Sequence, residues 1–135
     1  MMPTMTVREM LEAHPAPLAG DRDARVRCIE ACRDCALSCT SCADADVAED
    51  DRDMVRCVRL CLDCADVCET TSRVVTRQTA TDAGVVRAVV QACLAACRAC
   101  REECERHAKH HEHCRICADV CRRCEQACDE FLASS

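Results

Sequence analysis

Aromatic residues are almost absent from this chain of 135 residues, which has no Trp, no Tyr and a single Phe. A chain with a formal net charge of −6 and no aromatic stacking surfaces lacks the features typical of nucleic-acid binding. Glycine and proline are also scarce, with 2 and 3 residues, which favours long uninterrupted helices. The core must therefore be built mainly from another kind of residue.

Long apolar runs are missing as well. No run approaches the roughly 18 residues needed to span a membrane. The first twenty residues, MMPTMTVREMLEAHPAPLAG, lack the basic start and apolar stretch of a secretory signal. We therefore expect a single-domain cytoplasmic protein without membrane or nucleic-acid partners. Thiols stay reduced in that compartment, which argues against a framework of disulfides.

Cysteine is abundant instead, with eighteen residues in four runs whose spacing alternates strictly between three and four. This spacing is that of the inward-facing seam of a helix in a bundle, where Leu or Ile normally lies. Inert core thiols are a poor explanation, because sulfur seams pack less well than leucine seams. The runs are Cys28, Cys32, Cys35, Cys39 and Cys42; Cys57, Cys61, Cys64 and Cys68; Cys93, Cys97, Cys100 and Cys104; and Cys114, Cys117, Cys121, Cys124 and Cys128.

The pattern predicts an all-α fold, an antiparallel up-down-up-down four-helix bundle with a short N-terminal helix. We expect an N-terminal segment over residues 1–20 and a bundle with a cysteine-lined core over residues 21–135. The short helix should cover residues 4–13 and end before Pro15. The four long helices are expected from Asp21 to about residue 44, from the acidic turn at 43–51 to about 78, from Thr81 or Asp82 to about 107, and from a His-rich turn to about 132.

Soft thiolates suit Cu(I), zinc and iron–sulfur clusters. The net charge of the filled core favours Cu(I) among these three. One Cu(I) per thiolate replaces each lost proton with one positive charge, so the core stays near neutral. Four-thiolate zinc sites would each leave about two negative charges in a poorly solvated core. Iron–sulfur signatures cluster their cysteines in short loops. A zinc reservoir and an iron–sulfur electron-transfer protein nevertheless stay open as alternatives.

The seams differ beyond their last cysteines. Extended one way they reach aliphatic and aromatic positions, namely Val75, Val86, Val90 and Phe131. Extended the other way they reach further soft or nitrogen donors, namely Met54, His107, His110 and His111, with His113 nearby. We expect metal to pass through this second end. His107 and His111 are favoured as ligands because they keep the phase of the seam. No catalytic constellation emerges, so we do not expect an enzyme.

The four runs CIEACRDCALSCTSC, CVRLCLDCADVC, CLAACRACREEC and CRICADVCRRCEQAC resemble those of the bacterial copper storage proteins. The likeness is to the cytosolic branch and covers residues of about 21 to 132. It implies a homotetramer that binds many Cu(I) ions, mostly through C-x3-C pairs, with a mouth that bears histidines. It assigns copper to all eighteen cysteines and to His107 and His111. A copper chaperone or a low-molecular-weight thiol is the expected delivery partner.

Overall fold

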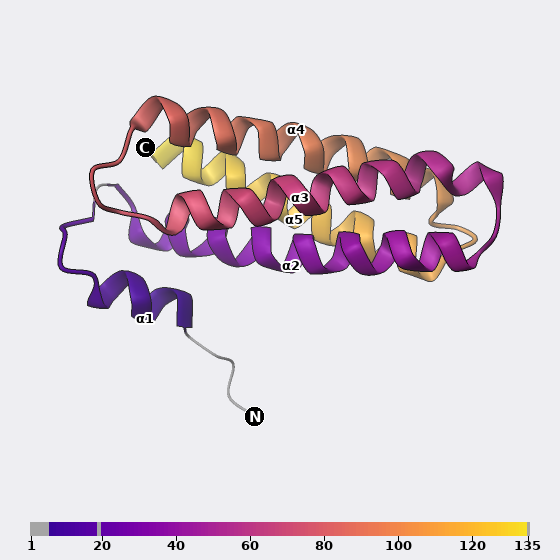
Figure 1. The fold of residues 1–135 in the computed structure, drawn as a ribbon, viewed down its shortest axis with the longest axis horizontal. Coiled ribbons are helices and arrows are strands. Elements are labelled where there is room, and N and C mark those ends of the chain that lie inside the picture. The colour runs from indigo at the N-terminus through magenta and orange to yellow at the C-terminus, as the bar shows by residue number, and fades with distance from the viewer. Residues whose placement is uncertain (1–5, 19, 135) are drawn as a thin grey trace.

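Four long helices pack side by side in the protein, as Figure 1 shows for a computed structural model that describes residues 6–18 and 20–134. No strand occurs in these residues, and the predicted all-α bundle is confirmed. Helix α2 packs against α3 and α5, and α4 packs against the same two helices. The elements are α1 (Thr6–Ala13), α2 (Arg22–Ala48), the 3-10 turn η1 (Arg52–Met54), α3 (Val55–Thr76), α4 (Ala83–His107) and α5 (Glu112–Ser134).

Aspartate side chains begin two of the long helices. Asp21 Oδ1 accepts a hydrogen bond of 3.1 Å from the Ala24 amide, and Asp82 Oδ1 accepts one of 3.0 Å from the Val85 amide. Each satisfies an amide that has no partner within its helix. The cap expected for α2 is therefore confirmed, and of Thr81 and Asp82, the two residues expected for α4, Asp82 is the cap. Residues 4 and 5, where the first short helix was expected to begin, lie outside the described residues.

The prediction of where α2 ends was wrong. The expected acidic turn over 43–51 is helical as far as Ala48, and the chain leaves the helix at Asp50, whose φ is 52°. Polar residues in the stretch ADADVA suggested a turn, but Asp46 is in phase with the cysteine seam and is only 1% exposed. The expected ends of α3 and α5 differ from the observed Thr76 and Ser134 by two residues.

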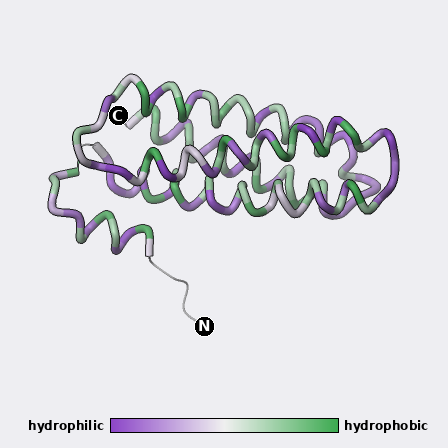
Figure 2. Tube along the Cα trace, viewed as in Figure 1, coloured by the Kyte–Doolittle hydropathy of each residue, from purple (hydrophilic) through white to green (hydrophobic). Residues whose placement is uncertain are grey.

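Sulfur fills the core along the length of the bundle, since all eighteen cysteines are buried and free of disulfides. At one end of the bundle, the hairpin loops between α2 and α3 and between α4 and α5 are hydrophilic (Figure 2). Helix α1 lies outside the bundle, held by buried Leu11 and by a 2.8 Å ion pair between Arg8 and Asp23. The division into a segment over 1–20 and a bundle over 21–135 stays a prediction.

Helix α4 has apolar residues on two sides. Its cysteines face the core, while Val85, Ala88, Ala92 and Ala95 form an exposed stripe with the same alternating spacing. By length and composition alone, α4 is the described helix that would suit a membrane span, yet only 22% of its most apolar stretch is buried in the bundle. Its buried cysteine row belongs to the shared core, whereas its apolar stripe on the outer side is exposed.

Candidate metal centre

The core thiols form a continuous ladder. Within one helix, Cys35 and Cys39 have sulfurs 3.8 Å apart, as a spacing of one helical turn allows. Between helices, the Cys35 sulfur lies 3.8 Å from that of Cys64 on α3 and 3.7 Å from that of Cys121 on α5. Each sulfur therefore has neighbours along its own helix and across the core, so a bound ion can be shared between helices.

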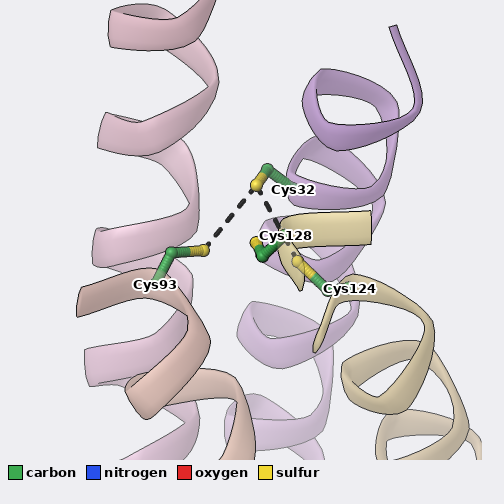
Figure 3. Close-up of side chains that lie close together, drawn as sticks. All are labelled: Cys32, Cys93, Cys124 and Cys128. Atoms are coloured by element: carbon green, nitrogen blue, oxygen red, sulfur yellow. Dashed lines mark hydrogen bonds between the residues drawn. The ribbon is translucent and has the colours of Figure 1, made fainter. Parts of the chain in front are cut away.

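Sets of four sulfurs lie mutually within 4.8 Å, and every member is buried. Figure 3 shows one of them, in which Cys32 on α2 lies 3.7 Å from Cys93 on α4 and 3.8 Å from Cys124 on α5, with Cys128 beside them. The sets include Cys32, Cys93, Cys124 and Cys128; Cys35, Cys39, Cys64 and Cys121; Cys35, Cys64, Cys68 and Cys97; Cys39, Cys100, Cys117 and Cys121; and Cys42, Cys61, Cys104 and Cys117.

These sets overlap, because Cys35, Cys39 and Cys121 each belong to two of those named. An ion that takes four thiolates for itself in one set removes ligands from the next. A thiolate that bridges two ions serves both sets at once. The ladder therefore suits ions that accept few ligands and share them, which describes Cu(I) better than tetrahedral zinc.

Cys39, inside the core, favours its neutral thiol in the metal-free protein. The pKa of Cys39 is raised because its thiol shares hydrogen bonds with Cys100 and Cys117, and burial disfavours the thiolate further. A metal ion that binds there must displace the thiol proton. The buried guanidinium of Arg25 acts on Cys28, the first cysteine of α2. At Cys39 the charge of the incoming ion itself compensates the thiolate.

His113 is the histidine that contacts the sulfur core. Its Nδ1 lies 3.4 Å from the sulfur of Cys42 and 3.6 Å from that of Cys114. Its Nε2 lies 3.0 Å from a carboxylate oxygen of Glu49, which holds the ring from the solvent side. The seam phase predicted His107 and His111 ahead of His113, because His113 directly precedes Cys114 and falls off the seam.

Asp46 is a functional candidate that the sequence analysis missed. Its side chain is fully buried beside the sulfurs of Cys42 and Cys114, and Oδ1 lies 3.6 Å from His113 Nδ1. Burial, and next its contact with Cys57, raises the pKa of this carboxyl to about 8. Its position four residues after Cys42 continues the seam, and that spacing was a signal available in the sequence.

The other histidines of this end pair with carboxylates. His107 Nε2 lies 3.0 Å from Glu103, a buried residue that is only 4% exposed and also binds Arg106. His111 Nδ1 lies 2.5 Å from Glu49. The rings of His107 and His111 are 6.5 Å apart, and those of His111 and His113 are 5.5 Å apart. The three imidazoles thus lie in a row that ends beside the sulfur of Cys42.

Met54 and His110 are the two remaining candidates. Met54 is 1% exposed and belongs to the hydrophobic core at the start of α3, so its thioether is inside the bundle. His110 is exposed in the loop between α4 and α5. The structure therefore brings His107, His111 and His113 together and leaves His110 on the surface.

The opposite end of the bundle is closed by apolar side chains. Val75, Val90 and Phe131 are buried there, with Val86 packed against them. Arg25 of α2 donates a hydrogen bond of 2.7 Å to the Val75 carbonyl at the end of α3, and its guanidinium lies 5.4 Å from the centre of the Phe131 ring. We call this set the apolar plug. It offers no soft donor beyond the last cysteines.

A helical bundle whose core is a ladder of buried, reduced thiols belongs to the class of metal-storing proteins. The sequence profile of the copper storage proteins (Csp) matches residues 21–133, which is most of the chain. The chain belongs to this family of non-enzymatic copper stores. No curated protein matches it by sequence.

Solved structures support this assignment. The copper storage protein Ccsp from Streptomyces lividans, loaded with 10 copper equivalents, is 52% identical and superposes with a TM-score of 0.92, covering 96% of this chain and 99% of the other. A structure of the cytosolic copper storage protein of Streptomyces lividans with five coppers is 52% identical, with a TM-score of 0.80, covering 84% of this chain and 95% of the other.

Proposed function

We propose that this protein stores copper as Cu(I) in the cytoplasm, bound by the thiolates of its eighteen core cysteines. The observation that carries the proposal is the overlap of the four-sulfur sets, in which residues such as Cys35 and Cys39 belong to two sets each. Cu(I) accepts two or three bridging thiolates, so neighbouring sets can be filled together. The cytosolic description of the Streptomyces lividans protein supports the same compartment.

Charge supports the oxidation state. Each Cu(I) replaces one thiol proton, so the buried core stays near neutral as it fills. Divalent ions with four thiolates each would leave about two negative charges per site in surroundings where a bare charge costs several kcal/mol. Because the buried thiols outnumber any other donor in the core, capacity should follow the cysteine count.

Copper should pass through the histidine end, where His107, His111 and His113 form a row that ends at Cys42 and Cys114. Imidazole is a weaker ligand for Cu(I) than thiolate, so these rings would transfer Cu(I) ions to the core thiolates. Met54 and His110 are further candidate ligands, the first inside the bundle and the second at its surface. A copper chaperone or a low-molecular-weight thiol would bring the ion to this end.

We also propose a homotetramer. The exposed stripe of Val85, Ala88, Ala92 and Ala95 on α4 supports it, because small apolar side chains allow two helices to approach closely and to shield each other from water. Sedimentation analysis tests this. Ala92→Glu places a charge in the middle of the stripe and should dissociate the assembly, while Arg98→Glu, which changes an exposed residue of the same helix, should not.

Anaerobic Cu(I) titration of the reduced protein tests the store itself. We expect uptake on the order of one Cu(I) per cysteine and a melting temperature that rises with loading, since the ion binds only the folded core. Saturation at four or five ions with a preference for Zn(II) would support a zinc reservoir instead. A visible charge-transfer colour from bound iron would support an iron–sulfur protein.

A pair of variants tests the sharing of sulfurs. Replacing Cys35 and Cys39 by serine removes ligands from three of the named four-sulfur sets, because Cys35 belongs to two sets and Cys39 to two. We expect capacity to fall by more than the two ions that independent sites would lose. Ser41→Ala on the exposed side of α2 is the matched control and should leave capacity unchanged.

A further inference from the structure

Four donors of three chemical kinds surround one point at the histidine end. They are the sulfurs of Cys42 and Cys114, Nδ1 of His113 and Oδ1 of Asp46. The nitrogen lies 3.4 and 3.6 Å from the two sulfurs and 3.6 Å from the oxygen. The oxygen lies 4.0 Å from Cys42 and 3.6 Å from Cys114. These five distances are five edges of a tetrahedron.

A tetrahedral zinc ion sets the lengths of such edges. With Zn–S bonds of about 2.3 Å and Zn–N or Zn–O bonds of about 2.0–2.1 Å, a sulfur lies about 3.6 Å from a nitrogen or oxygen, and the nitrogen about 3.3 Å from the oxygen. The observed 3.4–4.0 Å therefore requires shifts of only a few tenths of an ångström. The donors are placed for one ion at their centre.

Two further features of Asp46 and His113 favour the binding of a cation. The second carboxylate oxygen of Asp46, Oδ2, is buried and has no hydrogen-bond partner, although the residue is 1% exposed. Such an atom is costly unless a cation approaches it. On the other side, Glu49 accepts the Nε2 hydrogen of His113 at 3.0 Å, which leaves the Nδ1 lone pair directed at the sulfurs. A carboxylate behind a ligating histidine is the usual support of a zinc ligand.

The donor set also distinguishes this place from the rest of the core. Carboxylate oxygen and imidazole nitrogen are borderline to hard donors, and they suit Zn(II) better than Cu(I). Two thiolates and one carboxylate around Zn(II) leave one net negative charge, about half that of a four-thiolate site. Zinc therefore fits here at less electrostatic cost than anywhere in the all-sulfur ladder.

We propose that Cys42, Cys114, His113 and Asp46 form a single tetrahedral Zn(II) site at the histidine end of the copper-free protein. Three of these residues, Cys42, Cys114 and His113, are also proposed to bind copper. Asp46 is the ligand that belongs to the zinc site alone. Its place across α2 and α5, where the copper route meets the thiols, means that zinc joins these two helices there until copper takes the sulfurs.

X-ray absorption at the zinc edge of the reduced, copper-free, full-length protein with one equivalent of Zn(II) tests the ligand set. We expect two sulfur ligands at about 2.3 Å and two nitrogen or oxygen ligands at about 2.0–2.1 Å. Four sulfur ligands would place the ion in the thiol ladder and overturn the proposal. The measurement uses the unaltered chain, so it does not depend on whether a variant folds.

Variants test the role of the carboxylates. In competition with a chromophoric chelator, Asp46→Asn should weaken binding of the first Zn(II) by at least about 10–100-fold, and Glu49→Gln by about 10-fold. Asp44→Asn, which makes the same change on the exposed face of the same helix, is the matched control and should bind like the original chain. Unchanged affinity in Asp46→Asn would refute the site.

A parallel Cu(I) titration separates this inference from the proposed function. Asp46→Asn keeps all eighteen cysteines, so its Cu(I) capacity should match that of the original chain. Zinc binding lost with copper capacity kept is the expected pair of results. A low copper capacity in the original chain would refute the copper proposal alone, because the zinc measurement does not depend on it.

Discussion

Asp46 occupies a seam position. The spacing of the cysteines predicts a thiol or an aliphatic side chain there, but the chain has a carboxyl group. It is buried beside Cys42 and Cys114, and charging it there is unfavourable. A residue of this kind lowers the stability of a copper-free bundle. Its presence is explained if a cation uses it, and the same burial makes its titration measurable.

Asp46 should give the copper-free, zinc-free protein a falling stability with rising pH. The unfolded chain releases this proton near the ordinary pKa of 3.8, whereas the folded chain holds it up to a pKa of about 8. The stabilisation is therefore complete below about pH 4 and is lost progressively up to about pH 8, at no more than roughly 1.4 kcal/mol per pH unit.

Thermal melting between about pH 4.5 and 8 measures this effect. Relative to the original chain, Asp46→Asn should gain stability as the pH rises. The thiols of Cys42, Cys57 and Cys114 and the ring of His113 face the same carboxyl, so the difference between the two proteins is the informative quantity. Parallel pH profiles would mean that Asp46 is ionised in the fold throughout.

At the scale of elements, α1 differs from the other helices because it has no cysteine. Removing residues 1–19 should leave Cu(I) capacity unchanged. It should lower the melting temperature by several degrees, because buried Leu11 contributes about 2 kcal/mol. Titration and thermal melting check both parts, and Leu11→Ala in the full chain should reproduce most of the loss. A reduced capacity in the truncated chain would make α1 part of the store.

Elements were well predicted where one repeated feature defined them. The spacing of three and four residues places each cysteine run on one helix face, and Asp21 and Asp82 cap helices as expected. The prediction failed at 43–48, because local polarity indicated a turn while the contact of Asp46 with the core favoured a helix. Such a preference depends on packing between helices, which no short window of sequence contains.

Side-chain partners were harder to predict than helices. His113 lies off the seam, and its ring reaches Cys42 of α2 from the first turn of α5. The buried carboxylate of Glu103 beside His107, and the contact of Arg25 with the Val75 carbonyl, join residues on different turns or helices. The sequence indicates which end is rich in donors, but the pairs follow from how the helices are placed.

For the whole molecule, the contrast between the histidine end and the apolar plug determines how copper should move. Replacing His107 and His111 together by alanine should slow Cu(I) uptake and removal, while capacity falls by at most about one or two ions, because imidazole holds Cu(I) less well than thiolate. Stopped-flow measurements with a chelated donor give the rates, and the titration gives the capacity.

A variant of the apolar plug is the control for this experiment. Val86→Ala with Phe131→Leu should loosen the bundle, because both side chains pack against the core at that end, without speeding uptake. The reverse result, with normal uptake in the histidine variant and faster uptake in the plug variant, would place the copper route at the plug.

If the apolar plug is closed to copper, it also determines the order in which bound copper ions are released. If copper enters and leaves only at the histidine end, the ions bound last should be released first. This order holds as long as ions exchange slowly along the thiols. Protein loaded first with a light and then with a heavy stable isotope of copper should release copper enriched in the heavy isotope when a chelator begins to remove it. Release at the average isotope ratio would mean that copper ions exchange along the thiols faster than they leave the protein. The order of release would then be independent of the order of loading.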